Sequence, residues 1–160
     1  GDHRDLHSLR RRQRQMCIRD RYISSGMVKP YEDAKPCLER LKQLGLLTAV
    51  VSNMPRRFLM REVEATGLTD FFRVLIGYED TGGLEKPNPK PVLLACARLG
   101  VKPFEAVFVG DSELDYEAGV KAGVLTVLVD RGGVFKAGGN RYIMGSLVEL
   151  VSLVEGLRVG

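Results

Sequence analysis

The chain of 160 residues is 44% hydrophobic and 28% charged, a composition typical of a globular protein, and none of its apolar runs approaches the ~20 residues that a membrane-spanning helix needs. Its formal net charge of +4 resides in residues 1–21, where seven arginines outnumber three aspartates, while the other 139 residues carry 17 basic and 17 acidic side chains. A body without net charge gives no electrostatic reason to bind nucleic acid, so we predict neither a nucleic-acid partner nor a membrane partner.

Residues 1–27 differ in composition from the rest of the chain. The arginine-rich run within them lacks the apolar stretch of a secretory signal, and its only aromatic residue is Tyr22. We therefore predict that residues 1–27 are a non-native or disordered basic segment and that a single domain spans residues 28–160.

The three cysteines, Cys17, Cys37 and Cys96, form no CxxC pair and are odd in number. This pattern favours a reducing compartment, so we predict a cytoplasmic protein. Cys37 and Cys96 lie among apolar helix positions, where packing is their expected role.

From residue 28 onward, predicted helices and strands alternate. Asp33 precedes an amphipathic run that Gly45 ends, and it is the expected cap of that helix. Short apolar runs bounded by glycine or polar residues are expected to be buried parallel strands. In chain order, the prediction is a helix over 34–44, a strand over 46–51, a helix over 56–66, a strand over 73–77, a helix over 91–99, a strand over 106–110, a helix over 113–122, a strand over 124–130, an edge strand over 142–144 and a helix that Ser146 caps and that ends near 155. This alternation requires right-handed crossovers and predicts a doubly wound α/β domain with a parallel sheet.

Polar residues follow two of the predicted strands directly. Ser52 and Asn53 come after the first strand, and Asp111 comes after residues 106–110, with Asp115 in the first turn of the next helix. Ligands of such sheets collect at the carboxyl ends of the strands. Two acids in one small volume repel each other unless a cation lies between them, and Mg²⁺ prefers one or two carboxylates with water and phosphate oxygens. Asp111 and Asp115 therefore predict a Mg²⁺ site, with simple capping of the helix as the alternative.

Lys86 lies in a loop that prolines stiffen on its carboxyl side, Lys86-Pro87-Asn88-Pro89. A compact cation held by such a loop can neutralise a phosphoryl group, and Ser52 with nearby main-chain amides can bond the phosphoryl oxygens. Phosphoryl transfer needs little beyond such positioning, charge stabilisation and an in-line nucleophile.

Ser52-Asn53, Lys86-Pro87 and the run from Gly110 to Asp115 resemble three ordered motifs of the haloacid dehalogenase-like hydrolase superfamily, most closely its phosphoglycolate-phosphatase-like branch. The resemblance implies a Mg²⁺-dependent phosphatase of a small phosphorylated metabolite. It implies that Ser52 and Lys86 are catalytic and, with Asn53, bind the substrate, and that Asp111 and Asp115 hold Mg²⁺. Family members use an aspartate at the end of their first strand as the nucleophile, a second aspartate two residues later as acid and base, and a helical cap that selects the substrate.

The chain departs from this pattern before Ser52. No DxD occurs there, the cap region is reduced to residues 24–31, and Asp20 is the nearest imitation of the nucleophile. Because loss of a nucleophile costs covalent enzymes roughly six decades of rate, we expect activity near background. The first strand of the family is also missing. Either its two neighbouring strands close up or residues 14–28 fill the gap, and we expect the second, with residues 16–19 as the surrogate strand.

Other functional classes remain open or are excluded by the motifs. A non-catalytic module that binds phosphate and metal remains possible, as does a haloacid dehalogenase. A receiver domain would place its acids before its lysine, and the glycine patterns of dinucleotide and P-loop sites are absent from the sequence. Substrate identity and oligomeric state stay open.

Overall fold

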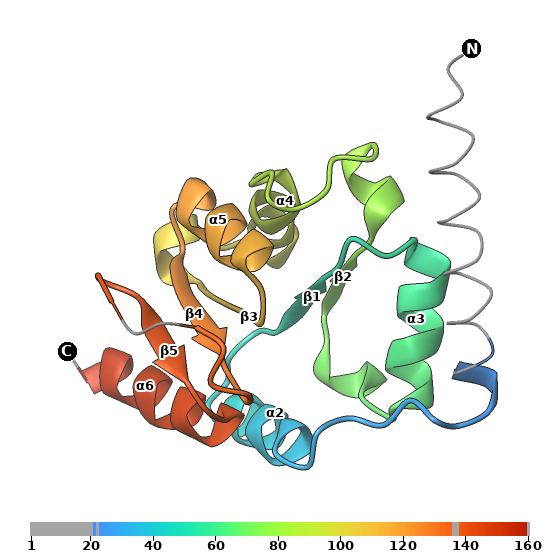
Figure 1. Ribbon diagram of the computed structural model, residues 1–160, viewed down its shortest axis with the longest axis horizontal. Helices are drawn as coiled ribbons and strands as arrows, with labels where there is room; N and C mark the ends of the chain where they lie inside the picture. The colour runs from blue at the N-terminus through green and yellow to red at the C-terminus, as the bar shows by residue number, and fades with distance from the viewer. Residues whose placement is uncertain (1–20, 22, 136–137, 160) are drawn as a thin grey trace.

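A computed structural model describes residues 21, 23–135 and 138–159. Figure 1 shows strands enclosed by helices. In chain order, the elements are α2 (Ala34–Gln43), β1 (Ala49–Val51), α3 (Arg56–Ala65), β2 (Val74–Ile76), α4 (Lys90–Leu99), β3 (Val107–Gly110), α5 (Glu113–Ala122), β4 (Leu125–Val129), β5 (Tyr142–Met144) and α6 (Leu147–Val159), with 3₁₀ turns at Thr69–Phe71, Tyr78–Thr81 and Pro103–Glu105. The predicted α/β alternation is confirmed, and no described helix has the length and apolar character needed to cross a bilayer.

Among residues 23–135 and 138–159, all strand pairs are parallel, and they form two separate sheets. One sheet joins β1 to β2, and the other has the order β3-β4-β5. β1 is shorter than the predicted strand because the amide of Leu46 bonds to the carbonyl of Leu41 at 3.0 Å and closes the end of α2. Gly45, with φ of 73°, provides the left-handed turn that this helix end requires.

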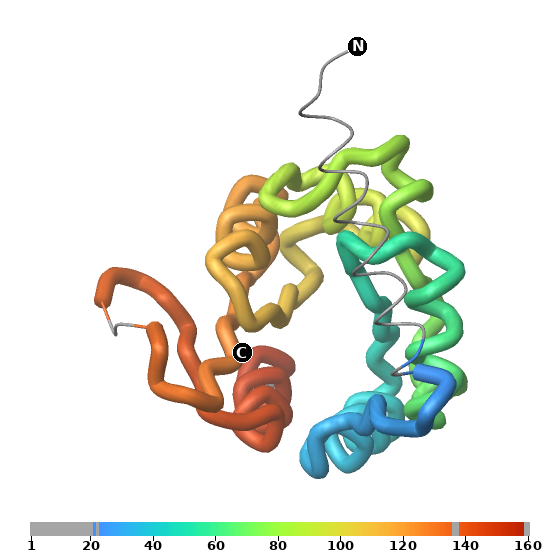
Figure 2. Tube along the Cα trace, turned by 45° about the vertical axis from the view of Figure 1, so that its right-hand side comes forward, coloured from blue at the N-terminus to red at the C-terminus, as the bar shows by residue number. Residues whose placement is uncertain are grey.

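β1 and β3 are not paired with each other, so the two strands that flank the expected gap do not close up in the part of the chain that the structure describes. Helices connect the two sheets instead. α4 contacts β1, β2 and α5, and α2 packs on α6 at the opposite side of the strands (Figure 2). Residues 16–19 lie outside the described residues, while Arg21, Ile23 and Ser24 are helical rather than extended.

The described part of the chain has three apolar core clusters. The first lies between α2, α6 and the sheet β3-β4-β5, the second between α4, α5 and β3, and the third between α3, β1 and β2. Cys37 and Cys96 are buried in the first two clusters, as their positions in the sequence predicted.

The prediction that Asp33 caps the first helix is wrong. Its side chain makes no capping bond to α2. Its carboxylate instead accepts two bonds from Arg131, at 2.9 and 2.7 Å, and one from the amide of Leu147 at the start of α6, at 2.8 Å. The Arg131 guanidinium, helped by the Leu147 amide, holds the pKa of Asp33 below its ordinary value despite partial desolvation. Asp33 therefore fixes α6 to the start of α2.

Candidate functional site

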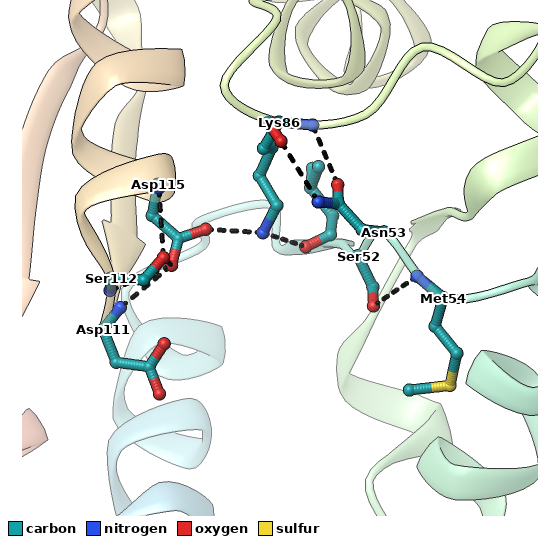
Figure 3. A network of polar contacts seen from close by, with 8 residues as sticks. Ser52, Asn53, Met54, Lys86, Asp111, Ser112 and Asp115 are labelled. Atoms are coloured by element: carbon teal, nitrogen blue, oxygen red, sulfur yellow. Dashed lines mark hydrogen bonds and ion pairs between the residues drawn. The ribbon is translucent and has the colours of Figure 1, made fainter. Parts of the chain in front are cut away.

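The ammonium of Lys86 lies between the carboxyl ends of β1 and β3 (Figure 3). Its Nζ atom is 2.5 Å from Oδ1 of Asp115 and 3.4 Å from the carbonyl oxygen of Val51, the last residue of β1. Lys86 therefore connects the two halves of the split sheet at the edge where ligands of parallel sheets bind.

Asn53 holds the backbone of Lys86 in place. Its Oδ1 accepts from the Lys86 amide at 2.9 Å, and its Nδ2 donates to the Lys86 carbonyl at 3.3 Å. The Lys86-Pro87 peptide bond that follows is cis. The side-chain amide of Asn53 thus makes the same pair of bonds to the Lys86 main chain that a neighbouring peptide group would make. These bonds position the lysine.

Two residues that the sequence analysis missed support the same loop. Thr81 is 1% exposed, and its hydroxyl contacts the carbonyls of Tyr78 and Leu84 at 3.1 and 2.7 Å. Asp80 accepts from the amide of Gly77 at 2.8 Å and pairs with Arg56 and Arg98 at 2.9 Å each. No periodic pattern or motif marks these residues, because Thr81 bonds to the main chain of its own loop and Asp80 pairs with side chains of α3 and α4.

Asp115 is buried, with 5% exposure, and both of its carboxylate oxygens are engaged. Oδ1 bonds to Lys86, while Oδ2 accepts from the amides of Asp111 and Ser112 at 3.1 and 3.2 Å and from the Ser112 hydroxyl at 2.7 Å. Burial acts to raise the pKa of Asp115, but the bonds from Lys86 and Ser112 outweigh burial and the net pKa is lowered. The carboxylate is therefore ionised at neutral pH, and its negative charge balances the positive charge of Lys86.

Gly110 allows Asp115 to occupy this position. A Cβ atom on Gly110 would lie 2.2 Å from the Cβ of Asp115, a distance that the structure does not tolerate. The absence of a side chain at Gly110 suggests that a ligand could approach the backbone there, but the structure shows that the Asp115 side chain fills that space.

Asp111 has the opposite environment. Its side chain is exposed, and within the described residues its carboxylate has no hydrogen bond or ion pair.

Ser52 follows β1, and its hydroxyl oxygen accepts a bond from the Met54 amide at 3.2 Å. The hydroxyl hydrogen of Ser52 is therefore not used in that bond. The Nζ atom of Lys86 also lies 5.9 Å from the centre of the Phe108 ring, and the Lys86 side chain is 13% exposed.

The donor set at this edge fits a loosely held Mg²⁺ ion. The described residues contain no group of three or more metal-ligating side chains. Asp111 offers one free carboxylate, and Mg²⁺ is commonly bound by one or two carboxylates together with waters and phosphate oxygens. Oδ2 of Asp115 accepts three bonds, whereas Oδ1 accepts one bond, from Lys86, and keeps a second lone pair, so these bonds do not prevent Asp115 from acting as a second ligand.

These contacts define an α/β protein with a fixed ammonium, a hydroxyl and a free carboxylate at the carboxyl edge of its strands, an arrangement suited to an anionic group. A family model described as haloacid dehalogenase-like hydrolase matches residues 8–129, and the chain belongs to that family. The resemblance read from the three motifs is thereby confirmed.

Curated relatives and solved structures agree with this assignment. The chain is 38% identical over 113 residues to a phosphoglycolate phosphatase of Aquifex aeolicus, an alignment that covers 69% of this chain and 53% of that protein. A HAD phosphatase from Thermococcus onnurineus superposes with a TM-score of 0.72 at 36% identity, covering 79% of this chain and 58% of that one. A dehalogenase structure superposes with a TM-score of 0.70 at 32% identity, covering 77% and 55%. The chain thus spans about half the length of the curated relatives it matches.

Proposed function

We propose that this chain carries the phosphoryl-binding half of a Mg²⁺-dependent phosphatase site for small phosphorylated metabolites, and that by itself it binds phosphate with turnover near background. The observation that supports the proposal is the position of Lys86, whose ammonium lies between Ser52 and Asp115. Relatives named as phosphatases of phosphoglycolate, of N-acetylmuramic acid 6-phosphate and of glyceraldehyde 3-phosphate support the substrate class.

Each residue has a separate task in this proposal. The Lys86 ammonium neutralises the phosphoryl oxygens, and the Ser52 hydroxyl donates to one of them. Asp115 and Asn53 position Lys86, as their bonds to its side chain and backbone indicate. Asp111 would hold Mg²⁺, which when bound supplies positive charge that stabilises the charge developing on the phosphoryl oxygens.

The missing nucleophile limits the chemistry. An aspartyl-phosphate route needs a carboxylate in line with the phosphoryl group, and the sequence contains no DxD before Ser52. Asp20 lies outside the described residues. With the charge-stabilising groups present and the nucleophile absent, binding without turnover is the expected behaviour.

The test is calorimetric titration of the full chain with inorganic phosphate, with and without MgCl₂. Replacing Lys86 by Met removes a charge-assisted bond worth ~1.5–3 kcal/mol, so we expect phosphate affinity to fall by about 10- to 100-fold. Lys90→Met is the matched control, because Lys90 is exposed at the start of α4 and its side chain takes no part in the site. Equal affinities for the two variants would contradict the proposal.

A hydrolysis assay tests the second half of the proposal. With p-nitrophenyl phosphate and MgCl₂, the chain should release nitrophenol no faster than the protein-free buffer. Turnover that the Asp20→Asn substitution abolishes would show that Asp20 serves as nucleophile and would overturn the proposed inactivity.

Dehalogenation is the second candidate, because solved dehalogenases share the fold at 32% and 31% identity. The exposed carboxylate of Asp111 favours the metal-dependent phosphatase, since a free acid at this edge suits a cation. Phosphate affinity that rises with MgCl₂ and is insensitive to 2-chloropropionate would support the phosphatase assignment, whereas tight 2-chloropropionate binding independent of MgCl₂ would support the dehalogenase.

A further inference from the structure

Two charged side chains cover the edge of β2 that faces away from β1. The carbonyl of Ile76 accepts a bond from the segment that follows β1, so by alternation Leu75 and Gly77 present their main-chain groups to the other edge. There, Nη1 of Arg56 donates to the carbonyl of Leu75 at 2.6 Å. The amide of Gly77 donates to Oδ2 of Asp80 at 2.8 Å. Side chains thus take the place of a neighbouring strand at these two groups.

Asp80 also joins two helices. Its side chain is 11% exposed, and its carboxylate pairs with Arg56 of α3 and with Arg98 of α4 at 2.9 Å each. Burial acts to raise the pKa of Asp80, but the bonds from the Gly77 amide and from the two arginines outweigh burial and the net pKa is lowered. The carboxylate is therefore ionised at neutral pH and holds α3 and α4 to the turn that leads to Lys86.

The loop between Asp80 and Lys86 is fixed at both of its ends. Two consecutive glycines, Gly82 and Gly83, have φ of 68° and 84°, and such residues lose much conformational freedom when a loop is ordered. At the start of the loop, Asp80 makes its ion pairs and the buried Thr81 hydroxyl bonds within the turn. At its end, two bonds hold the main chain of Lys86.

The same turn is joined to the segment that carries Ser52. The amide of Tyr78 donates to the carbonyl of Met54 at 2.9 Å, and the amide of Arg56 donates to Oε2 of Glu79 at 2.7 Å. The turn of residues 78–81 therefore lies between the segment of the hydroxyl and the loop of the ammonium, and it bonds to the main chain of the former.

We propose that Asp80 is a positioning residue of the phosphoryl-binding site: by pairing with Arg56 and Arg98 it fixes the start of the loop whose end holds the Lys86 ammonium. The inference rests on the proposed phosphate-binding function. In it, Asp80 touches no phosphate and acts on affinity only through Lys86, whose ammonium it keeps within reach of an anion at Ser52.

Two variants with opposite changes in charge separate position from charge. Asp80→Asn makes the protein more positive and Arg98→Met makes it less positive, yet both break the link between α4 and the turn. In calorimetric titrations of the full chain with inorganic phosphate and MgCl₂, we expect each variant to bind phosphate about three- to tenfold more weakly. Asp70→Asn and Arg73→Met are the matched controls, because both residues are exposed in the connection between α3 and β2. Opposite changes in affinity, or no change, would overturn the proposal.

A double variant tests whether Asp80 acts through the lysine. In the Lys86→Met background there is no ammonium to position, so Asp80→Asn should not weaken phosphate binding further. An additional loss as large as the one in the presence of Lys86 would refute the proposal.

Amide exchange in the absence of phosphate tests the positioning role independently of the proposed function. In the folded full chain, Asp80→Asn should speed exchange of the Lys86 amide at least about threefold more than exchange of the Val127 amide, which lies in the buried part of β4. Arg98→Met, at a side chain 41% exposed, should act in the same direction and serves if Asp80→Asn does not fold. Equal acceleration at both amides would show a general loss of stability and would overturn the inference. An unchanged phosphate affinity of Lys86→Met alone would instead contradict the proposed function.

Discussion

Replacing Asp115 by Asn should destabilise the protein far more than removing any exposed acid. Asp115 is 7% exposed at its side chain and Lys86 is 13% exposed, so the substitution leaves a nearly buried ammonium without its counter-charge. The new amide group also puts a donor against either Lys86 or the amides of Asp111 and Ser112. Breaking a buried ion pair costs ~3–5 kcal/mol, and because Lys86 keeps its bond to the Val51 carbonyl, we expect a loss of about 3 kcal/mol.

Urea unfolding at pH 7, followed by circular dichroism, measures this loss as a change in midpoint at constant slope. Glu113→Gln is the matched control, because it removes the same charge from the same helix where Glu113 is 52% exposed and pairs with Arg141, and it should have little measurable effect. The double variant with Lys86→Met should be less destabilised than the sum of the two single variants. Additive losses, or a loss no larger than that of the control, would refute the role assigned to the pair.

Three further outcomes follow from the same contacts. Gly110→Ala should lower the free energy of unfolding by about 1–3 kcal/mol in urea titrations, because its Cβ would meet Asp115 at 2.2 Å, whereas Gly138→Ala, with no atom within 4 Å, should not. Asn53→Ala should weaken phosphate binding by about three- to tenfold in calorimetry through loss of its two bonds to the Lys86 backbone, and an unchanged affinity would contradict its positioning role. The lowered pKa of Asp115 means that its ionised form contributes stability that is fully present above the ordinary value of 3.8 and is lost as the pH falls through the lowered folded-state pKa. Urea unfolding between pH 7 and pH 3 should therefore show a flatter decline below pH ~4 for Asp115→Asn than for the unsubstituted chain, and parallel curves would exclude that linkage.

The sequence predicted secondary structure best where local signals and tertiary contacts agree. Residues 113–122 form α5 with the predicted bounds, because Ser112 accepts from the Asp115 amide and Gly123 ends the helix in the left-handed conformation. At Asp33 the local signal was misleading. The residue has the chemistry of a helix cap, but Arg131 and the start of α6, about one hundred residues further along the chain, compete for its carboxylate.

The sequence identified which residues gather at the site but not how their atoms are distributed. Spacing treats Asp111 and Asp115 as equivalent acids, although the structure buries one against Lys86 and leaves the other exposed. That difference arises from the close packing of Asp115 over Gly110 and from the approach of a loop that lies 29 residues away in the chain. Both the packing over Gly110 and the approach of the Lys86 loop depend on tertiary structure, so the spacing of the motif residues cannot predict them.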